Sequence, residues 1–306
     1  MALRLDPTAA TTVDVFSADH APVATISPGE RLTVRSLDAS GYLERQEHPG
    51  QERPRLHPGG RGHCLTGPVA VRGARPGQLL ALRLHALRPD SWGWTVAAAA
   101  DTPVTRRLGL AEGPPSWLLW ELDADTGLGR ESRGFVRDLA PFLGVMGVAP
   151  SEPGAHSTIP PRSGSGGNLD CRELVAGSTL YLPVAVPEAL LYLGDGHAAQ
   201  GDGEVGGTAI ECGMTTELTV DVTDRPLGTI HAETPAGLVT FGFDADLNAA
   251  TGDALDAMVT WMQSLHHVDR ATALALASTS VDVRVTQVAN RTWGVHALLP
   301  TGALRR

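Results

Sequence analysis

The sequence predicts an α+β fold in which β-strands predominate. Short apolar runs recur between turn-forming residues, and the 35 glycines and 22 prolines are spread along all 306 residues. This alternation of short apolar runs and turn-forming residues is typical of a sheet-rich protein. Helical spacing of apolar residues appears only late in the chain. We therefore expect a β-rich N-terminal part, residues 1–150, and an α+β part, residues 151–306, with the boundary near Pro150.

The candidate strands are runs rich in Val and Leu that end at Gly, Pro or Asp. In chain order they are Leu32–Ser36, Val69–Val71, Leu79–Leu84, Leu180–Val186 and Leu218–Val222. Between the second and the third lies the turn Gly-Ala-Arg-Pro-Gly at residues 73–77. A turn of this composition between two apolar runs indicates a hairpin-like connection.

Two helices are expected near the C-terminus. The first follows Asp253, which is a suitable N-cap, and its apolar residues recur at helical spacing. These residues are Leu255, Met258, Val259, Met262 and Leu265. The second helix is expected from Arg270 through Ala277, before a strand-like run at Val281–Val288.

Charge and composition exclude several kinds of partner. The net charge of −10 argues against nucleic acid and against an anionic membrane surface. No apolar run is long enough to cross a bilayer, and no apolar signal segment precedes Asp6. The three cysteines, Cys64, Cys171 and Cys212, are too few for a disulfide framework and suit a reducing compartment. We therefore expect a soluble, cytoplasmic protein with buried thiols.

The chain contains no lysine, so all 24 basic residues are arginines. This absence removes several mechanisms. A Schiff-base lysine, a P-loop phosphate lysine, a Ser/Lys amidase dyad and a Cys/Glu/Lys site all require an amine that the chain lacks.

Polar residues that can bind a metal gather between Pro141 and Glu211, within a glycine-rich and apolar stretch. The apolar run Ala189–Leu193 leads into Asp195-Gly-His197, and Asp202-Gly-Glu204 follows. On an extended strand, i, i+2 spacing puts both side chains on one face. Together with Asp170 and with His63 from an earlier segment, these residues form a mixed donor set suited to zinc or a similar divalent ion. The candidate ligands are Asp170, Asp195, His197 and His63, with Asp202 and Glu204 beside them.

A divalent ion polarises a carbonyl and provides hydroxide at neutral pH. A carboxylate that is not a ligand, with Glu204 as first choice, could take the proton of the water and pass it on. Asn168 and Gln200 could orient a substrate. The alternative interpretation is that the Asp-Gly pairs form ordinary turns, that Asn168 and Gln200 close turns, and that His63 is hydrogen-bonded in the core.

Several ordered segments resemble the acetamidase/formamidase family. They are LTGPVAVRGARPG, PFLGVMGVAP, STIPPRSGSGGNLD, LYLPVAV and GDGHAAQGDGEVGGTAIE, and in the tail DADLNAATGDALDAM and STSVDVRVTQVANRTWGVHALLP. The resemblance implies a β-sandwich-like N-terminal part packed on an α+β part, a homo-oligomer, a divalent metal, and hydrolysis of a small amide to a carboxylate and ammonia.

Carried over to this sequence, the resemblance places the site around Asp170 in GGNLD, Asp195 and His197 in GDGH, Gln200, and Glu204 in GDGE, with His63 as a further candidate. The catalytic roles fall to Glu204 and Asp170. Two stretches depart from the family pattern, the Arg/Glu/Pro-rich segment after SPGERLTV and the sequence that follows Trp-Gly-Trp. A larger amide, or a urea-like or guanidine-like compound, therefore stays open as the substrate.

Two other functions remain as alternatives. The same scaffold could hold a small ligand or a structural calcium ion without turnover, because calcium prefers many oxygen ligands and the segment is rich in Asp. A cysteine hydrolase could use Cys64 with His63, or Cys171 beside Asp170. Adjacent side chains diverge on a strand, which disfavours the cysteine alternative.

Overall fold

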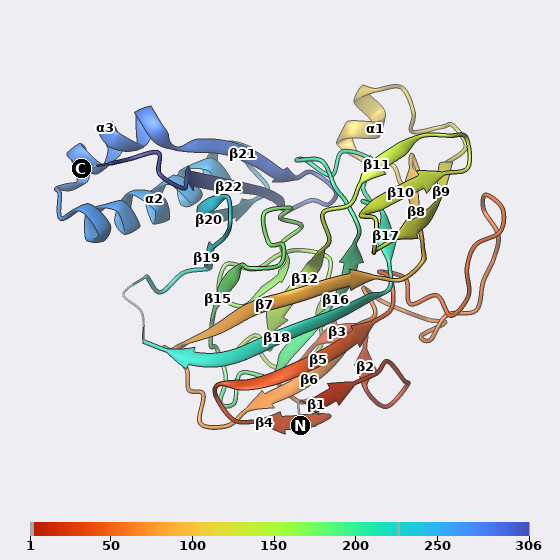
Figure 1. Ribbon diagram of the computed structural model, residues 1–306, viewed down its shortest axis with the longest axis horizontal. Coiled ribbons are helices and arrows are strands. Elements are labelled where there is room, and N and C mark those ends of the chain that lie inside the picture. The colour runs from red at the N-terminus through yellow and green to blue at the C-terminus, as the bar shows by residue number, and fades with distance from the viewer. Residues whose placement is uncertain (1–2, 225–226, 306) are drawn as a thin grey trace.

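The computed structural model describes residues 3–224 and 227–305. These ranges form two large β-sheets and three helices, so the predicted α+β fold with predominant β is confirmed (Figure 1). Within the same ranges, no helix is both long and apolar enough to cross a membrane.

The first sheet has nine strands and carries the helices at one end. Its neighbouring strands are, in order, β1 (Leu3–Leu5), β5 (Glu30–Ser36), β18 (Met214–Thr223), β7 (Leu79–Pro89), β15 (Thr179–Pro183), β19 (His231–Glu233), β20 (Gly237–Asp244), β22 (Trp293–Pro300) and β21 (Asp282–Gln287). All of its pairings are antiparallel except that of β1 with β5.

The second sheet has eleven strands and carries most of the candidate site residues. Its main path is β11 (Val136–Asp138), β10 (Leu128–Glu131), β9 (Ser116–Asp123), β8 (Trp92–Ala97), β17 (Glu211–Cys212), β16 (Leu191–His197), β12 (Phe142–Val148) and β14 (Gly166–Asn168). The strand β6 (Leu65–Val71) pairs with β16, and β2 (Thr12–Val13) and β4 (Ala24–Ile26) pair with β6. A small separate sheet joins β3 (Val15–Phe16) to β13 (His156–Ser157).

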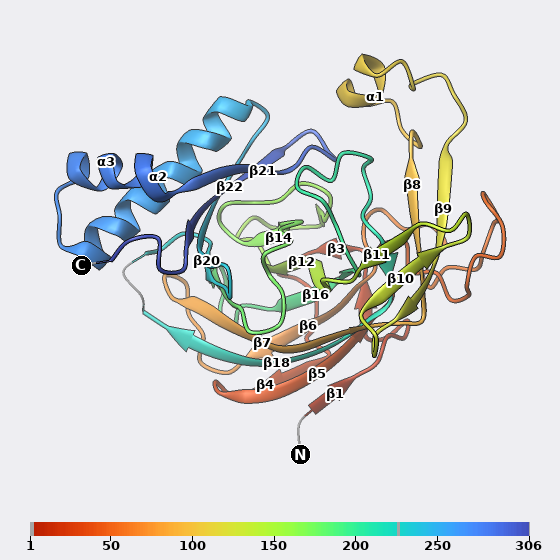
Figure 2. The ribbon, with the colours of Figure 1, turned by 45° about the horizontal axis from the view of Figure 1, so that its top comes forward.

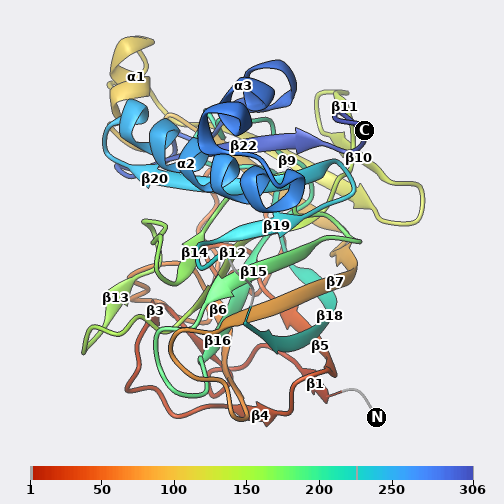
Figure 3. The same ribbon diagram turned by 90° about the vertical axis from the view of Figure 1, so that its left-hand side faces the viewer.

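The helices α2 (Leu247–His266) and α3 (Arg270–Ser280) pack on β20 and β22, away from the N-terminal strands (Figures 2 and 3). The predicted cap of the first helix is wrong, because Asp246 and not Asp253 accepts the backbone N–H of Asn248. The additional first turns bury Ala250 against β20, and this packing outweighs the weak helix propensity of Gly252. The short α1 (Pro103–Arg107) is capped by Thr102.

The hairpin predicted around residues 73–77 is wrong. β6 pairs with β16 in the eleven-stranded sheet, whereas β7 pairs with β18 and β15 in the nine-stranded sheet. The turn therefore carries the chain from one sheet to the other. All seven residues of β6 are buried. A central position in the sheet therefore stabilises this strand more than pairing with β7, the next strand in the sequence, would.

A hydrophobic core joins the two sheets. Leu80, Leu82 and Leu218 of the nine-stranded sheet are fully buried in the same cluster as Phe142 and Leu191 of the eleven-stranded sheet. Each large sheet takes strands from both sides of residue 150. The two parts predicted around that residue therefore share their sheets and their core.

Candidate active site

The end of β16 supplies two candidate site residues, Asp195 and His197. β16 lies between β12 and β6, and all seven of its residues are buried. Asp195 has a φ of 61°, in the left-handed region that non-glycine residues adopt only at a cost. Nε2 of His197 lies 3.4 Å from Oδ1 of Asp195. The two side chains therefore meet, as their spacing predicts.

Asp170 joins them from the segment after β14. The backbone N–H groups of Leu169 and Asp170 both donate to the carbonyl of Gly144, at 2.8 and 3.2 Å, and Asp170 has a φ of 49°. Ligand atoms of Asp170, Asp195 and His197 all lie within 4.8 Å of one another. The structure thus brings three of the four predicted metal ligands into one buried cluster.

Gly144 on β12 leaves the space that this cluster occupies. A Cβ built there would lie closest to Oδ2 of Asp195, and 2.8 Å from both Oδ1 of Asp170 and Cε1 of His197. Any side chain at this position would displace the three groups. The glycine in the PFLGVMG segment is therefore required by close approach.

Glu204 reaches the site from a turn between β16 and β17. The turn is held by the N–H of Gly203, which donates to the carbonyl of Thr286, and by the N–H of Val288, which donates to the carbonyl of Gly203. Glu204 has a φ of 42° and is 7% exposed. It forms a second cluster with His197 and Glu211.

Asp202 does not share a face with Glu204, contrary to the prediction from their spacing. The segment is a turn in which Gly203 has a φ of 95°, so the alternation of an extended strand does not apply. Asp202 instead lies 3.7 Å from Nη1 of Arg284, in a group with Glu173 and His296.

Glu211 is a site residue that the sequence analysis did not single out. It begins β17 opposite His197, and its Oε1 lies 3.4 Å from Nε2 of that histidine. It is 2% exposed and also accepts the N–H of Ala209 at 2.9 Å. The sequence feature that could have identified Glu211 is its position as a carboxylate between the apolar residues Ile210 and Cys212.

His63 lies at the edge of the cluster. Its Nε2 is 3.9 Å from Oδ2 of Asp195, and its Nδ1 is 2.9 Å from the hydroxyl of Thr158. The hydroxyl also accepts the backbone N–H of His63 at 2.7 Å. The role of His63 as a metal ligand stays a prediction.

Asn168 and Gln200 occupy different positions. Asn168 lines the cavity, where its Nδ2 donates to the carbonyl of Ile159 and its buried Oδ1 has no hydrogen-bond partner among the described residues. Gln200 is not among the residues that line this cavity. Its Oε1 is 2.9 Å from Nδ1 of His197, and its Nε2 donates to the carbonyl of Asp170 at 2.7 Å. Contact of Gln200 with substrate stays a prediction.

Several buried oxygens in the cluster lack hydrogen bonds from the part of the chain that the structure describes. They are both carboxylate oxygens of Asp170, Oδ1 of Asp195 and Oε2 of Glu211. A buried carboxylate without donors is costly unless a cation or a proton compensates it. This donor set, three carboxylates and an imidazole, fits a divalent metal ion.

Burial and mutual repulsion shift the pKa values of the site. Burial raises the pKa values of Asp170 and Glu204 well above the ordinary values of these groups. Burial also raises the pKa of Glu211 to about 7. Burial opposes the charge on His197, but the carboxylates of Glu211 and Asp195 raise its pKa well above the usual value. Burial also works to raise the pKa of Asp195, yet the nearby histidines hold it below its ordinary value. These shifts indicate that a proton or another cation is favoured next to the carboxylates.

The carboxylates of the cluster line a cavity of about 410 Å³. Its buried part includes the carboxylates of Asp170, Asp195, Glu204 and Glu211. The exposed residues Arg55, Gly60 and Arg61 also line it. A substrate can therefore enter from the surface and reach the acids.

The cysteines are poorly suited to act as nucleophiles. Cys64 lines the cavity, but burial raises the pKa of its thiol to about 12. Burial also raises the pKa of Cys171 and of Cys212, and both are fully buried. The thiolate is the reactive form, so these environments disfavour a cysteine hydrolase.

Comparison with known proteins gives one consistent family. The model of the Acetamidase/Formamidase family matches residues 7–154 and 152–239. A solved structure of an acetamidase from Bacillus halodurans aligns with a TM-score of 0.86 and 27% identity, over 97% of each chain.

Two sequence relatives match over shorter stretches. A Schizosaccharomyces pombe protein is 26% identical over 231 residues, which cover 59% of this chain and 56% of that protein. An acetamidase from Mycolicibacterium smegmatis is 44% identical over 66 residues, which cover 21% of this chain and 16% of that one. The matched part of the chain thus spans little more than half the length of the first relative and less of the second.

Proposed function

The chain belongs to the acetamidase/formamidase family, and we propose that it hydrolyses an amide to a carboxylate and ammonia in the carboxylate-lined cavity. One observation carries this proposal. Ligand atoms of Asp170, Asp195 and His197 lie within 4.8 Å of one another, the two aspartates line the cavity, and three of their carboxylate oxygens have no hydrogen-bond partner among the described residues.

We propose that these three residues hold a divalent ion, with His63 beside them. Zinc suits the mixture of imidazole and carboxylate donors better than calcium, which prefers oxygen ligands alone. When bound, such an ion polarises a carbonyl and lowers the pKa of a water molecule. The closeness of the donors, and the space left by Gly144, support this assignment.

Gln200 orients the histidine of this set. Its Nε2 donates to a carbonyl, so its Oε1 is the atom that faces His197 and can only accept. Nδ1 of His197 therefore carries a hydrogen, and Nε2 is directed toward Asp195 and Glu211, 3.4 Å from an oxygen of each. A hydrogen bond of this kind fixes the tautomer and the ring orientation of a ligating histidine.

Glu204 is suited to move the proton. It lines the same cavity as the proposed ligands, and burial followed by the charge of Asp170 raises its pKa well above the ordinary value. A carboxylate of raised basicity takes the proton of the attacking water and delivers it to the leaving nitrogen. The unpartnered Oδ1 of Asn168, in the same cavity, is placed to accept an N–H of the substrate amide.

Ammonia release tests the proposal. The purified protein is assayed with formamide, acetamide and longer amides, as isolated, after chelation, and after zinc or calcium is added back. Restoration of ammonia release by one metal supports the proposal. Asp170→Asn is expected to abolish the restoration, whereas Asp256→Asn, which changes an exposed carboxylate of α2, is expected to leave it intact.

Two results would contradict the proposal. Folded protein that releases no ammonia from any amide with any metal would indicate a ligand-binding module. If chelation lowers the melting temperature but leaves ammonia release unchanged, the bound ion is structural.

A further inference from the structure

The cavity is larger than formamide or acetamide requires. Four non-hydrogen atoms, each given the volume of about 30 Å³ that a water molecule occupies in the liquid, fill about 120 Å³. The cavity measures about 410 Å³, which lies in the range of pockets that enclose larger organic ligands. Exposed residues of the segment 55–63, namely Arg55, Gly60 and Arg61, also line this cavity.

The lining of the cavity carries both signs of charge. The four carboxylates already described are buried in its wall, whereas the exposed Arg55 and Arg61 and the half-buried His57 and Asp14 also line it. A ligand with one anionic end would be repelled by the acids and attracted by the arginines. The lining therefore favours a single orientation of such a ligand.

Of the two arginines, Arg55 is the one without an anionic partner. The carboxylate of Asp14 accepts the backbone N–H of Arg61 at 2.7 Å and lies 3.6 Å from its guanidinium. Among the described residues, Arg55 forms no ion pair. Its guanidinium donates to the hydroxyl of Tyr42 at 2.8 Å and lies 4.7 Å from the centre of that ring. Most of its donors stay available to a ligand.

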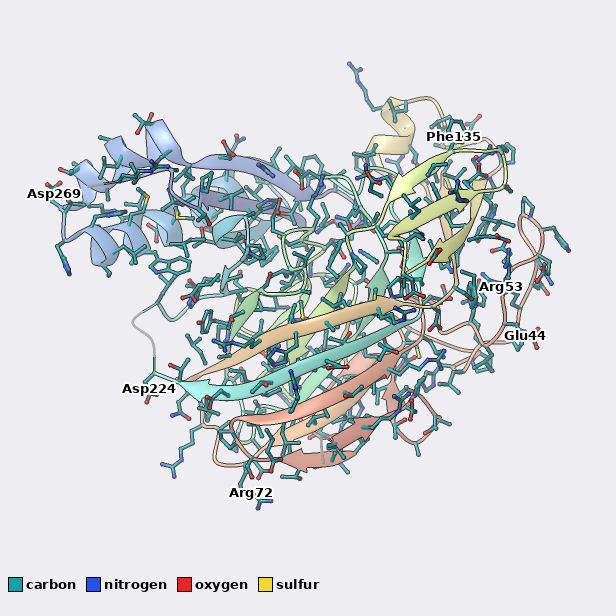
Figure 4. The ribbon with its side chains drawn as sticks, viewed as in Figure 1. Glu44, Arg53, Arg72, Phe135, Asp224 and Asp269 are labelled. Carbon is teal, nitrogen blue, oxygen red and sulfur yellow. The ribbon has the colours of Figure 1, made fainter. Side chains whose placement is uncertain are left out.

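The surrounding segment holds Arg55 in place. Tyr42 and Arg55 form a β-bridge, and the N–H of Leu56 donates to the carbonyl of Gly41 at 2.9 Å. Arg53, labelled in Figure 4 on the loop that carries it, stacks at 3.5 Å on the same tyrosine ring. Two guanidinium groups thus share one aromatic ring, and neither forms an ion pair within the described chain.

We infer that the substrate is an amide that also carries a carboxylate, and that Arg55 binds this carboxylate while the amide group lies among the buried acids. The inference rests on the proposed hydrolysis and names its substrate class. Water adds its oxygen to the amide carbon, the C–N bond breaks, and the nitrogen leaves as ammonia, so a dicarboxylate is formed. A guanidinium can bind the distant carboxylate through two parallel hydrogen bonds, which a lysine could not provide.

The test compares two amides of similar length, the anionic succinamate and the neutral butyramide, together with acetamide. Arg55→Gln is compared with Arg45→Gln, which changes an arginine of the same segment that pairs with Glu121 outside the cavity. We expect Arg55→Gln to lower kcat/KM for succinamate by about 10–100-fold and to change the values for butyramide and acetamide by less than about 2-fold. Arg45→Gln is expected to change none of them.

Equal kcat/KM values of the wild type for succinamate and butyramide would overturn the inference, and so would an equal effect of Arg55→Gln on both. Calorimetric binding of succinamate separates this inference from the proposed function. If no amide is hydrolysed but succinamate binds the wild type and binds Arg55→Gln more weakly, the recognition holds and the hydrolase proposal fails. If acetamide is hydrolysed while succinamate neither binds nor reacts, the hydrolase proposal holds and the recognition fails.

Discussion

Nδ1 of His197 lies 2.9 Å from Oε1 of Gln200, whose Nε2 donates to the backbone carbonyl of Asp170 at 2.7 Å. One buried carboxamide thus connects two proposed metal ligands that are far apart in the sequence. It fixes the hydrogen of the imidazole on Nδ1 and leaves Nε2 directed into the cluster.

Replacing Gln200 by Leu removes the acceptor for His197 while keeping a side chain of similar size. We expect the affinity for zinc to fall by about 10–100-fold, because the ring loses its fixed orientation. Competition with a chromogenic chelator at neutral pH measures this affinity. Gln46→Leu is the control, since Gln46 is also buried but bonds to Arg53 and to His48. Equal affinities of the two variants would exclude the orienting role.

Replacing Glu204 by Gln keeps the shape of the side chain and removes its ability to accept a proton. We expect kcat to fall by about 10²–10⁴-fold, the range typical of a lost general base. Bound zinc and the melting temperature should stay close to those of the wild type, because Gln has the same shape and Glu204 is not one of the proposed metal ligands. Glu121→Gln, at an exposed carboxylate, is the control. A variant that keeps its kcat would show that another group moves the proton.

Replacing Gly144 by Ala introduces a Cβ into the space that Asp170, Asp195 and His197 occupy. We expect zinc binding to be lost and the free energy of unfolding to fall by about 1–3 kcal/mol, as for an overpacked core. Urea unfolding and metal analysis measure the two effects. Gly164→Ala is the control, because a Cβ there meets no atom within 4 Å. Retention of full zinc binding in Gly144→Ala would disprove the proposed placement of the ion.

We expect the burial of Asp38 to make the stability of the protein depend on pH, without involving the candidate metal ligands. Its side chain is 1% exposed and accepts hydrogen bonds from Trp94, Ser40 and Tyr42. Burial raises its pKa to about 6, despite these bonds. The folded protein therefore holds this proton up to a higher pH than the unfolded chain, in which the pKa is about 3.9. The contribution of Asp38 to stability is full below about pH 4 and is lost as the pH rises through about 6.

Asp38→Asn stays neutral at every pH and should remove this dependence. We expect the unfolding free energy of the variant, relative to the wild type, to increase by about 2 kcal/mol between about pH 4 and pH 7. Urea unfolding at several pH values measures the difference, with Asp256→Asn at an exposed site as control. A difference that is constant with pH would show that Asp38 is ionised throughout.

The residue pattern was sufficient to predict the fold class and most members of the buried polar cluster, whose roles stay predictions. Asp170, Asp195, His197 and Glu204 were selected because carboxylates and an imidazole gather between glycines in an apolar segment. The structure buries all four, and the three carboxylates line one cavity. The pairing of Asp195 with His197 followed from local spacing, because both residues belong to one strand. Local chemistry of this kind needs few contacts with distant parts of the chain.

Other features depended on contacts between distant segments. Glu211 enters the site because β17 pairs with β16, and Asp202 leaves it because the turn at Gly203 directs it toward Arg284. The turn at residues 73–77 joins two sheets, since burying all of β6 is more favourable than pairing it with its neighbour.

The sequence by itself determined a β-rich chain without lysine, with an acidic, glycine-rich segment that is predicted to bind a metal. Only the tertiary structure decided which carboxylates converge, and that Arg55 lines the same cavity without an ion pair among the described residues. The physical reason is that residue type and spacing set local conformation and chemistry, whereas the position of a buried charge depends on which distant strands pack around it.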